Sequence, residues 1–233
     1  MKTQNIGGLN SARERWNDRV ISMLTVVLIL MLFVFTPLQA AVVSVSGITV
    51  FQVLGFASAL VLIGGVFFVS ASPVVAAAMV AALAMAVWAA FARLTAPSHF
   101  DIYLLAGAWL LMSLVLIIVV GRTVFATGRV NYHRIVGAIL VYLSVATTFA
   151  ALFTFVGLLI PKAFSGMSFE DSPALAGNVI YFSFVTLTST GYGDIFPVHP
   201  VARSLCNLET ILGQLYPATL LARLVSLEVE SRR

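Results

Sequence analysis

A short run of hydroxyl residues and glycines, Thr186-Leu187-Thr188-Ser189-Thr190-Gly191-Tyr192-Gly193-Asp194, is the part of the chain that could do chemistry. A potassium ion leaves water only if other oxygens replace its hydration shell. Backbone carbonyls can do this where an extended chain points several of them one way, and alternating glycines permit the backbone angles, including positive φ. The hydroxyl of Ser189 can add the innermost ligand, while Tyr192 points away and braces the strand. The candidate K+ ligands are therefore Ser189, Thr190, Gly191, Tyr192 and Gly193.

The rest of the chain has the composition of a membrane protein. Of its 233 residues, 61% are hydrophobic and 9% are charged, against roughly 25% charged residues in soluble domains. The net charge of +4 does not indicate nucleic-acid binding, because the basic residues lie at the ends of apolar runs and form no basic module. The single cysteine, Cys206, excludes an intrachain disulfide framework and a cysteine-based metal site.

Apolar runs of about 20 residues are long enough to cross a bilayer. Six runs approach or exceed this length, the last of them partly polar: Val20–Ala41, Ile48–Ser70, Pro73–Phe91, Ile102–Val120, Ile135–Ile160 and Val201–Leu227. The segment Ala174–Thr188 is too short to cross and predicts a re-entrant helix. The expected fold is an all-α integral membrane protein with six transmembrane helices, a re-entrant pore helix and a selectivity-filter loop.

The basic residues predict the orientation, because Lys and Arg are in excess on the cytoplasmic side. With the N-terminus inside, ten of the 13 lie on the cytoplasmic side, and only Arg93, Lys162 and Arg203 lie near the outside. We therefore expect a multi-pass protein of the cell membrane with both termini cytoplasmic. The expected parts are a cytoplasmic N-terminal segment (1–19), a four-helix transmembrane domain (20–125), a cytoplasmic linker (126–134), a pore domain (135–227) and a cytoplasmic tail (228–233).

The setting of Gly191-Tyr192-Gly193-Asp194, between two spans and after a short amphipathic segment, resembles the tetrameric potassium channels of the pore-loop superfamily. The resemblance covers about residues 135–227, and the first four spans look like those of small bacterial six-span members without an Arg-bearing voltage sensor. It implies a homotetramer in lipid that conducts K+ passively, with K+ at the filter and no other cofactor, no nucleic-acid partner and no enzymatic activity. Asp194 would make the outer mouth acidic and concentrate cations there.

The resemblance also implies a set of residues that support the filter. Tyr181 and Phe182 stand where the family often has two aromatic residues that pack around it. Val185 stands where some members have a buried Glu, so that carboxylate is missing here. Ser189 replaces the usual Thr and keeps its hydroxyl, and Thr190 replaces the usual Val and adds one. Both changes are compatible with K+ binding, and they motivate a weakly selective alternative.

The sixth span carries a polar stripe. Asn207, Thr210 and Gln214 share one helix face, which Leu221 continues. Either this face lines a water-filled cavity or its side chains make interhelical hydrogen bonds; we take Thr210, Gln214 and Leu221 as candidate cavity-lining residues. The resemblance makes Gly213 the gating hinge, and Pro217 is expected to add a second bend.

Glu209 is a carboxylate placed well inside a span, and such residues are functional candidates. At about 100° per residue it points roughly 200° away from Asn207, so we expect it to be buried behind the pore. There it should be protonated or hydrogen-bonded. Thr186, Ser183 and Arg203 are its possible partners.

The leading interpretation is a potassium-selective channel that is not strongly voltage-gated, because the fourth span, Ile102–Val120, contains no Arg or Lys. A weakly selective cation channel is a second interpretation, motivated by Ser189 and Thr190. A non-conducting regulatory membrane protein on the same pore fold is a third. A potassium-uptake transporter subunit is less favoured, since such chains usually carry four filter segments and this chain has one.

Overall fold

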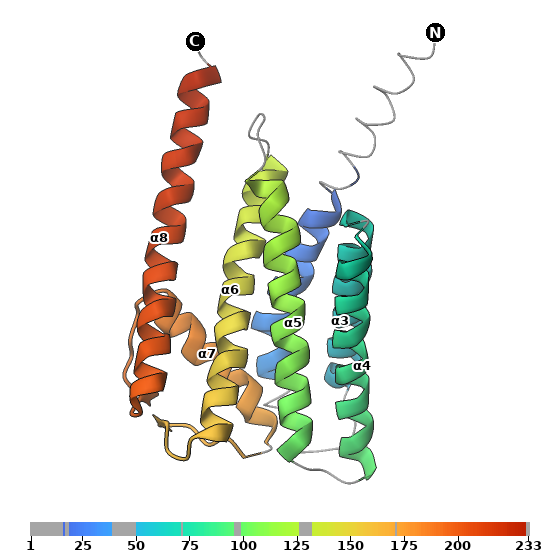
Figure 1. Ribbon diagram of the computed structural model, residues 1–233, viewed down its shortest axis with the longest axis vertical. Coiled ribbons are helices and arrows are strands. Elements are labelled where there is room, and N and C mark those ends of the chain that lie inside the picture. Colours follow the sequence, from blue (N-terminus) through green and yellow to red (C-terminus); the bar gives the residue numbers. More distant parts are fainter. Residues whose placement is uncertain are drawn as a thin grey trace.

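The protein is described by a computed structural model that covers residue 16 and residues 19–38, 50–70, 72–95, 99–125, 132–170 and 172–231. The described elements are long helices that run side by side and two very short strands (Figure 1). The first long helix, Arg19–Leu38, contains a π-helical stretch, η1 (Met31–Phe35). The other elements are α3 (Val50–Val69), α4 (Pro73–Thr95), α5 (His99–Val124), α6 (Tyr132–Leu159), β1 (Phe164–Ser165), α7 (Pro173–Leu187), β2 (Phe196–Pro197) and α8 (Pro200–Ser231).

The helices follow from the apolar sequence and from local start signals. In lipid the backbone has no water to bond, so a crossing segment must satisfy its N–H and C=O groups internally, as a helix does. Three helices begin at a proline: Pro73 in α4, Pro173 in α7 and Pro200 in α8. Proline suits the first helical position because its fixed φ matches the helix and its missing N–H would have no partner there.

Four helices in the described part of the chain are long and apolar enough to cross a membrane: Arg19–Leu38, Pro73–Ala92, Phe100–Val124 and Tyr132–Leu159. Ala174–Leu187 is a shorter apolar helix. The chain is therefore an all-α membrane protein. α3 and α8 are helices at the places of the second and sixth expected spans, but they are not among these four.

Small residues let the first helix approach its neighbours closely. Gly65 of α3 lies against Leu24, and Gly137 of α6 lies against Ile21. Thr25 Oγ1 donates to the carbonyl of Val136 on α6 at 3.3 Å. This helix lies behind α5 and α6 in the view of Figure 1, so the first helix belongs to the same packed core as the outer helix of the expected pore unit.

The loops on either side of α7 are tied together at one end of the molecule. β1 pairs with β2 in antiparallel register, with Phe164 opposite Pro197. The Val198 N–H donates to the carbonyl of Ala163 at 2.8 Å. This small sheet joins the segment before α7 to the segment before α8, so it brackets α7 together with the loop that carries the candidate filter.

Candidate functional site

The candidate filter begins where α7 ends. After Leu187 the chain leaves the helix, and its next N–H groups turn back to bond the last helical carbonyls. Ser189 N–H donates to Thr186 O and Thr190 N–H donates to Val185 O, both at 2.9 Å. The filter segment is therefore anchored to the C-terminal turn of α7, the end of the helix that carries a partial negative charge.

The backbone of the filter segment takes unusual angles. Gly191 and Gly193 have φ of 59° and 81°, values that glycine adopts without strain. Ser189 has φ of 56°, which is uncommon for a residue with a Cβ and marks a constrained site. Residues 188–194 are all exposed on the surface of the single chain, so at membrane depth this backbone needs protein or a water-filled cavity around it.

Tyr192 is held against α7 by a second tyrosine. Its ring stacks on the ring of Tyr181, with centroids 6.3 Å apart and an interplanar angle of 2°. The Tyr181 hydroxyl donates to Asp194 Oδ2 at 2.8 Å. Tyr181 thus contacts the two residues that flank Gly193, and it links this end of the candidate filter to the middle of α7.

The other two residues expected to support the filter lie in the interior. Phe182 is 3% exposed and packs against Phe153 and Phe164, with ring centroids 5.0 and 5.5 Å away. Val185 is buried, and its carbonyl is the acceptor for Thr190 N–H. The aromatic cluster joins α6, β1 and α7, so it fixes the helix from which the filter starts.

Two polar side chains of α8 reach the joint between α7 and the filter. Thr210 Oγ1 donates to Thr186 O at 3.3 Å. Gln214 Nε2 donates to Ser189 Oγ at 2.9 Å. Thr210 is half-buried and Gln214 is exposed on the single chain. The side chains proposed to line a cavity therefore also make hydrogen bonds between elements.

Gly213 is a point of close backbone approach. A Cβ at this position would collide with the carbonyl oxygen of Leu187. α8 is one helix from Pro200 to Ser231 and contains Pro217 in its interior. Leu221, the last residue of the expected stripe, is 63% exposed. Glycine at 213 is thus required by packing in this structure, whatever bending it also permits.

Glu209 lies fully inside the chain, at 0% exposure. Its Oε1 is 2.5 Å from Ser183 Oγ on α7, and its Oε2 has no hydrogen-bond partner. Of the three candidate partners, the structure brings Ser183 to Glu209. Thr186 is engaged through its carbonyl by Thr210, and Arg203 donates to Pro197 O at 3.3 Å.

The other end of α8 contacts the end of α5. Arg223 Nη2 donates to Phe125 O at 2.8 Å, and the guanidinium carbon lies 5.1 Å from the centre of the Phe125 ring. Phe125 also meets Tyr216 edge-on, and the Tyr216 hydroxyl donates to Ala138 O on α6. These contacts were not expected from the sequence, because 98 positions separate the partners and neither belongs to a motif.

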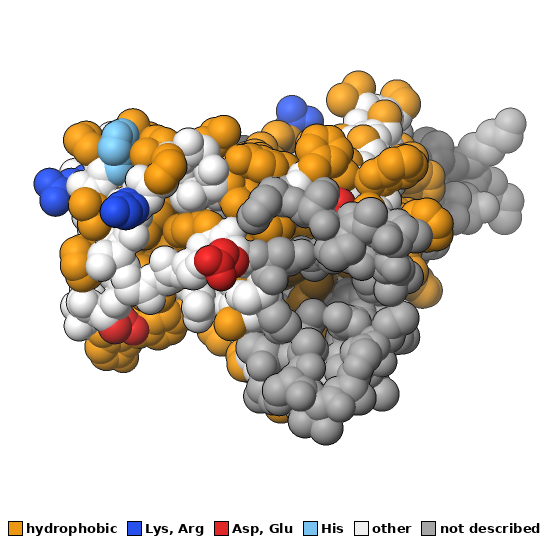
Figure 2. All heavy atoms as spheres, turned by 90° about the horizontal axis from the view of Figure 1, so that it is seen from below, with side chains coloured by type: hydrophobic (Ala, Val, Ile, Leu, Met, Phe, Trp, Pro, Cys, Tyr) orange, Lys and Arg blue, Asp and Glu red, His pale blue; other side chains and the backbone are white. Residues whose placement is uncertain are grey.

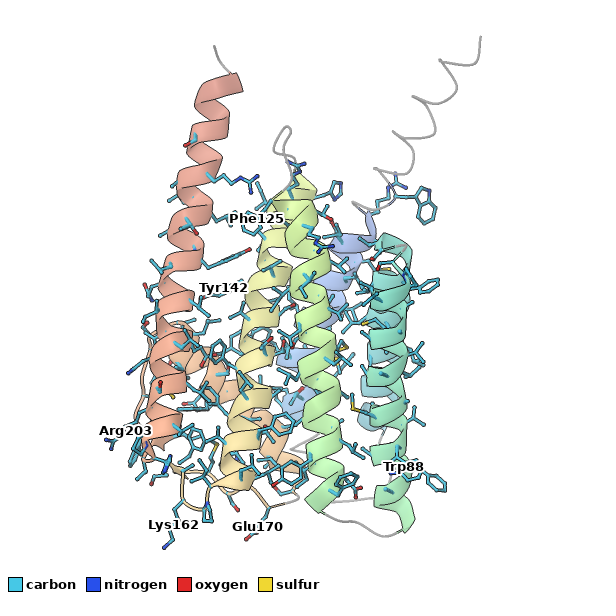
Figure 3. The ribbon with its side chains drawn as sticks, in the orientation of Figure 1. Trp88, Phe125, Tyr142, Lys162, Glu170 and Arg203 are labelled. Carbon is cyan, nitrogen blue, oxygen red and sulfur yellow. The ribbon has the colours of Figure 1, made fainter. Side chains whose placement is uncertain are left out.

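The labelled charged residues mark the filter end of the molecule. Lys162, Glu170 and Arg203 lie at the end opposite Phe125 (Figure 3). Figure 2 looks onto the filter end and shows basic and acidic side chains scattered among hydrophobic and uncharged ones. No group of three or more His, Cys, Asp or Glu side chains able to hold a metal ion occurs in the described part of the chain.

Comparison with known proteins agrees with this geometry. Residues 137–230 match a family described as "Ion channel". The match begins in α6 and runs through α7, the filter and α8, which is less than half of the chain. No curated protein and no solved structure matches the chain. The C-terminal part is therefore similar to ion channels of the pore-loop type, which points to a transport protein in a membrane and not to an enzyme.

Proposed function

We propose that the chain is a subunit of a potassium-selective channel whose filter is formed by residues 189–193. The observation that carries the proposal is the exposed segment at the end of α7, where Gly191 and Gly193 adopt positive φ and Tyr192 is stacked on the chain's own pore helix. Such a strand offers carbonyl oxygens on one side while its aromatic side chain is held on the other. Ser189 adds a hydroxyl at its inner end.

The same exposure supports a homotetramer with the filter on its axis. One chain has one filter strand and cannot enclose a pore, and lipid cannot cover the exposed backbone of residues 188–194. Four copies around an axis would cover this backbone with protein on one side and leave a water-filled pore on the other. The carboxylate of Asp194 would then be repeated around the outer mouth and would attract cations.

The arrangement of the helices supports six crossings with both termini on the cytoplasmic side. The start of the first long helix and the end of α8 lie at the same end of the molecule (Figure 1), and the filter loop lies toward the other end. In this arrangement α3 and α8 are the second and sixth crossings, α7 is re-entrant, and residues 20–125 and 135–227 are the first domain and the pore domain.

The channel is proposed not to be strongly voltage-gated. Moving one charge through the membrane field is worth about 2.3 kcal/mol per 100 mV, so a voltage sensor needs basic residues inside a mobile span. α5 carries Arg122 in its last turn and no other Lys or Arg. It therefore offers no row of charges to move.

A weakly selective cation channel is the second candidate, because of the hydroxyl at position 190. Thr190 Oγ1 lies 2.8 Å from Thr188 Oγ1, so a hydrogen bond stands where the family has an apolar side chain. Such a bond can pull the strand away from the geometry that suits K+. Selectivity, and not conduction itself, separates the two candidates.

A flux assay tests the proposal with a matched pair of glycine variants. The protein is reconstituted into liposomes loaded with KCl, and uptake of K+ tracer is compared with uptake of Na+ tracer. Gly191→Ala puts a Cβ where φ is 59°, whereas Gly177→Ala lies in α7 with no atom within 4 Å of the new Cβ. We expect uptake of K+ over Na+ by the parent and by Gly177→Ala, and loss of uptake in Gly191→Ala. No uptake by the parent would favour the non-conducting alternative.

The oligomeric state is tested independently by native mass spectrometry in mild detergent. The proposal requires four chains of 25.0 kDa. A stable monomer or dimer would contradict it.

A further inference from the structure

The surroundings of Glu209 pose a problem of hydrogen counting. Ser183 Oγ lies 2.5 Å from Glu209 Oε1 and 2.7 Å from the carbonyl oxygen of Ala146 on α6. A serine hydroxyl has one proton to donate. If Glu209 were an ionised carboxylate, both neighbours of the hydroxyl would be acceptors, and one of the two short oxygen pairs would contain no proton.

A proton on the carboxyl group resolves the count. The carboxyl O–H then donates to Ser183 Oγ, and the Ser183 O–H donates to Ala146 O. The second oxygen, Oε2, has no partner. It is then a neutral carbonyl oxygen, whose burial costs far less than that of a charged carboxylate oxygen. In the described part of the chain no basic side chain is bonded to Glu209, so nothing there compensates a negative charge.

The resulting hydrogen-bond chain connects three helices. Glu209 belongs to α8, Ser183 to α7 and Ala146 to α6. Ser183 and Glu209 are both 0% exposed. One helical turn after Ser183, α7 ends at Leu187 and the filter begins. The hydrogen-bond chain therefore holds α7 just behind the filter. The neighbouring α8 residues contact the end of α7 and the start of the filter: Thr210 bonds Thr186 O, Gly213 lies against Leu187 O, and Gln214 bonds Ser189 Oγ.

We propose that Glu209 is a positioning residue that carries a proton and, through Ser183 and the Ala146 carbonyl, fixes α7 between α6 and α8 so that the filter keeps its conducting geometry. The proposal rests on the function proposed above. It assigns Glu209 to the support of the filter and not to the ion path, where four carboxylates would bind cations directly.

Three variants separate the effect of losing the ionisable proton of Glu209 from the effect of losing its hydrogen bond to Ser183. Glu209→Gln replaces the carboxyl O–H by an amide N–H that can still donate to Ser183. Glu209→Ala removes the donor, and Ser183→Ala removes the relay. Ser113→Ala is the matched control. Ser113 is nearly as buried, at 1% exposure, and accepts a hydrogen bond from Thr148 Oγ1 of α6 at 2.9 Å, but it lies on α5, away from the filter.

The first measurement is independent of conduction. Infrared difference spectra of the reconstituted parent and of Glu209→Gln should show the carbonyl stretch of a protonated carboxylic acid in the parent alone. Absence of that band contradicts the proposal even if the protein conducts K+. Its presence in a protein that does not conduct supports the hydrogen-bond chain while the proposed function fails.

The second measurement is single-channel recording in bilayers. Loss of one buried donor should lower the open probability of Glu209→Ala and of Ser183→Ala by about tenfold. Glu209→Gln should stay within about twofold of the parent, since its donor is retained. Ser113→Ala should lower only the thermal stability of the protein. The proposal is overturned if Glu209→Gln is as impaired as Glu209→Ala, or if Ser183→Ala affects open probability no more than Ser113→Ala.

Discussion

In the proposed orientation α8 has an outer and an inner half, and the two halves are held in different ways. The outer half, Pro200–Gln214, is fixed to α7 and the filter by four neighbouring residues, which we call the α8 seam: Glu209, Thr210, Gly213 and Gln214. The inner half, beyond Pro217, is held by the contact of Arg223 with Phe125 at the end of α5. The difference indicates that the first half of α8 supports the filter, whereas the second half meets the end of α5 through Arg223.

This comparison assigns separate roles to the two halves. Changes in the α8 seam should alter selectivity, conduction or open probability, because they act on the geometry of the filter. Changes at Arg223 should alter open probability and leave selectivity unchanged, because they act on the second half of α8 and not on the filter. Pro217 lies between the halves, where an interior proline removes a backbone hydrogen bond and eases bending.

Among the changes that test this comparison, the largest effect is expected for Gly213→Ala. The new Cβ would collide with Leu187 O, a backbone atom that cannot move without shifting the start of the filter. Overpacking of this kind costs roughly 1–3 kcal/mol, so K+ flux should fall by as much as about a hundredfold. Gly121→Ala on α5, where nothing lies within 4 Å, is the control and should leave flux unchanged. Normal flux in Gly213→Ala would show that the α8 seam is not tightly packed.

A smaller effect is expected for Gln214→Leu. This change removes the hydrogen bond to Ser189 Oγ and frees the hydroxyl at the inner end of the filter. One such bond is worth about 0.5–1.5 kcal/mol, so the preference for K+ over Na+ should fall up to about tenfold, as measured from bi-ionic potentials. Asn207→Leu changes an exposed amide on the same helix and should have no such effect. Equal shifts in both variants would argue against a specific role for Gln214.

Tyr181→Phe tests the outer end of the filter. The phenylalanine keeps the stack on Tyr192 but loses the hydrogen bond to Asp194. Because the site is exposed on the single chain, we expect a loss of about 1 kcal/mol, seen as a several-fold faster decline of current when external K+ is removed. Unchanged decline would mean that the carboxylate of Asp194 does not brace the filter.

The smallest effect is expected for Arg223→Gln, in the inner half of α8. It removes a cation–π contact and weakens the bond to Phe125 O, together worth about 1 kcal/mol. Open probability should change by a few fold while the reversal potential stays the same. Ser226→Ala, which removes a bond within the same helix, is the control. A shift of the reversal potential in Arg223→Gln would break the division between the two halves.

The sequence was most informative where one local rule determines the structure. Long apolar runs predict helices because lipid leaves the backbone no other way to satisfy its hydrogen bonds. A short apolar segment before the glycines predicts the break after α7, and the helix found there, Pro173–Leu187, is one residue out of register with the expected Ala174–Thr188. The glycines at 191 and 193 mark the positive φ values directly.

Contacts between distant segments could not be derived in the same way. Helix periodicity turns Glu209 away from Asn207, but it leaves several partners open, because the rotation of α7 against α8 is fixed only by packing. Periodicity puts Thr210 on the polar stripe and turns its neighbour Glu209 away from that stripe, yet both side chains reach α7. The contact between Arg223 and Phe125 has no sequence signal, since it depends on where two separate helices end.

The measurement that tests the central claim most directly is the reversal potential of the purified protein in bilayers with opposed K+ and Na+ gradients. A filter made by residues 189–193 predicts a reversal potential close to the K+ equilibrium potential. A value midway between the two equilibrium potentials would contradict potassium selectivity and favour the weakly selective channel.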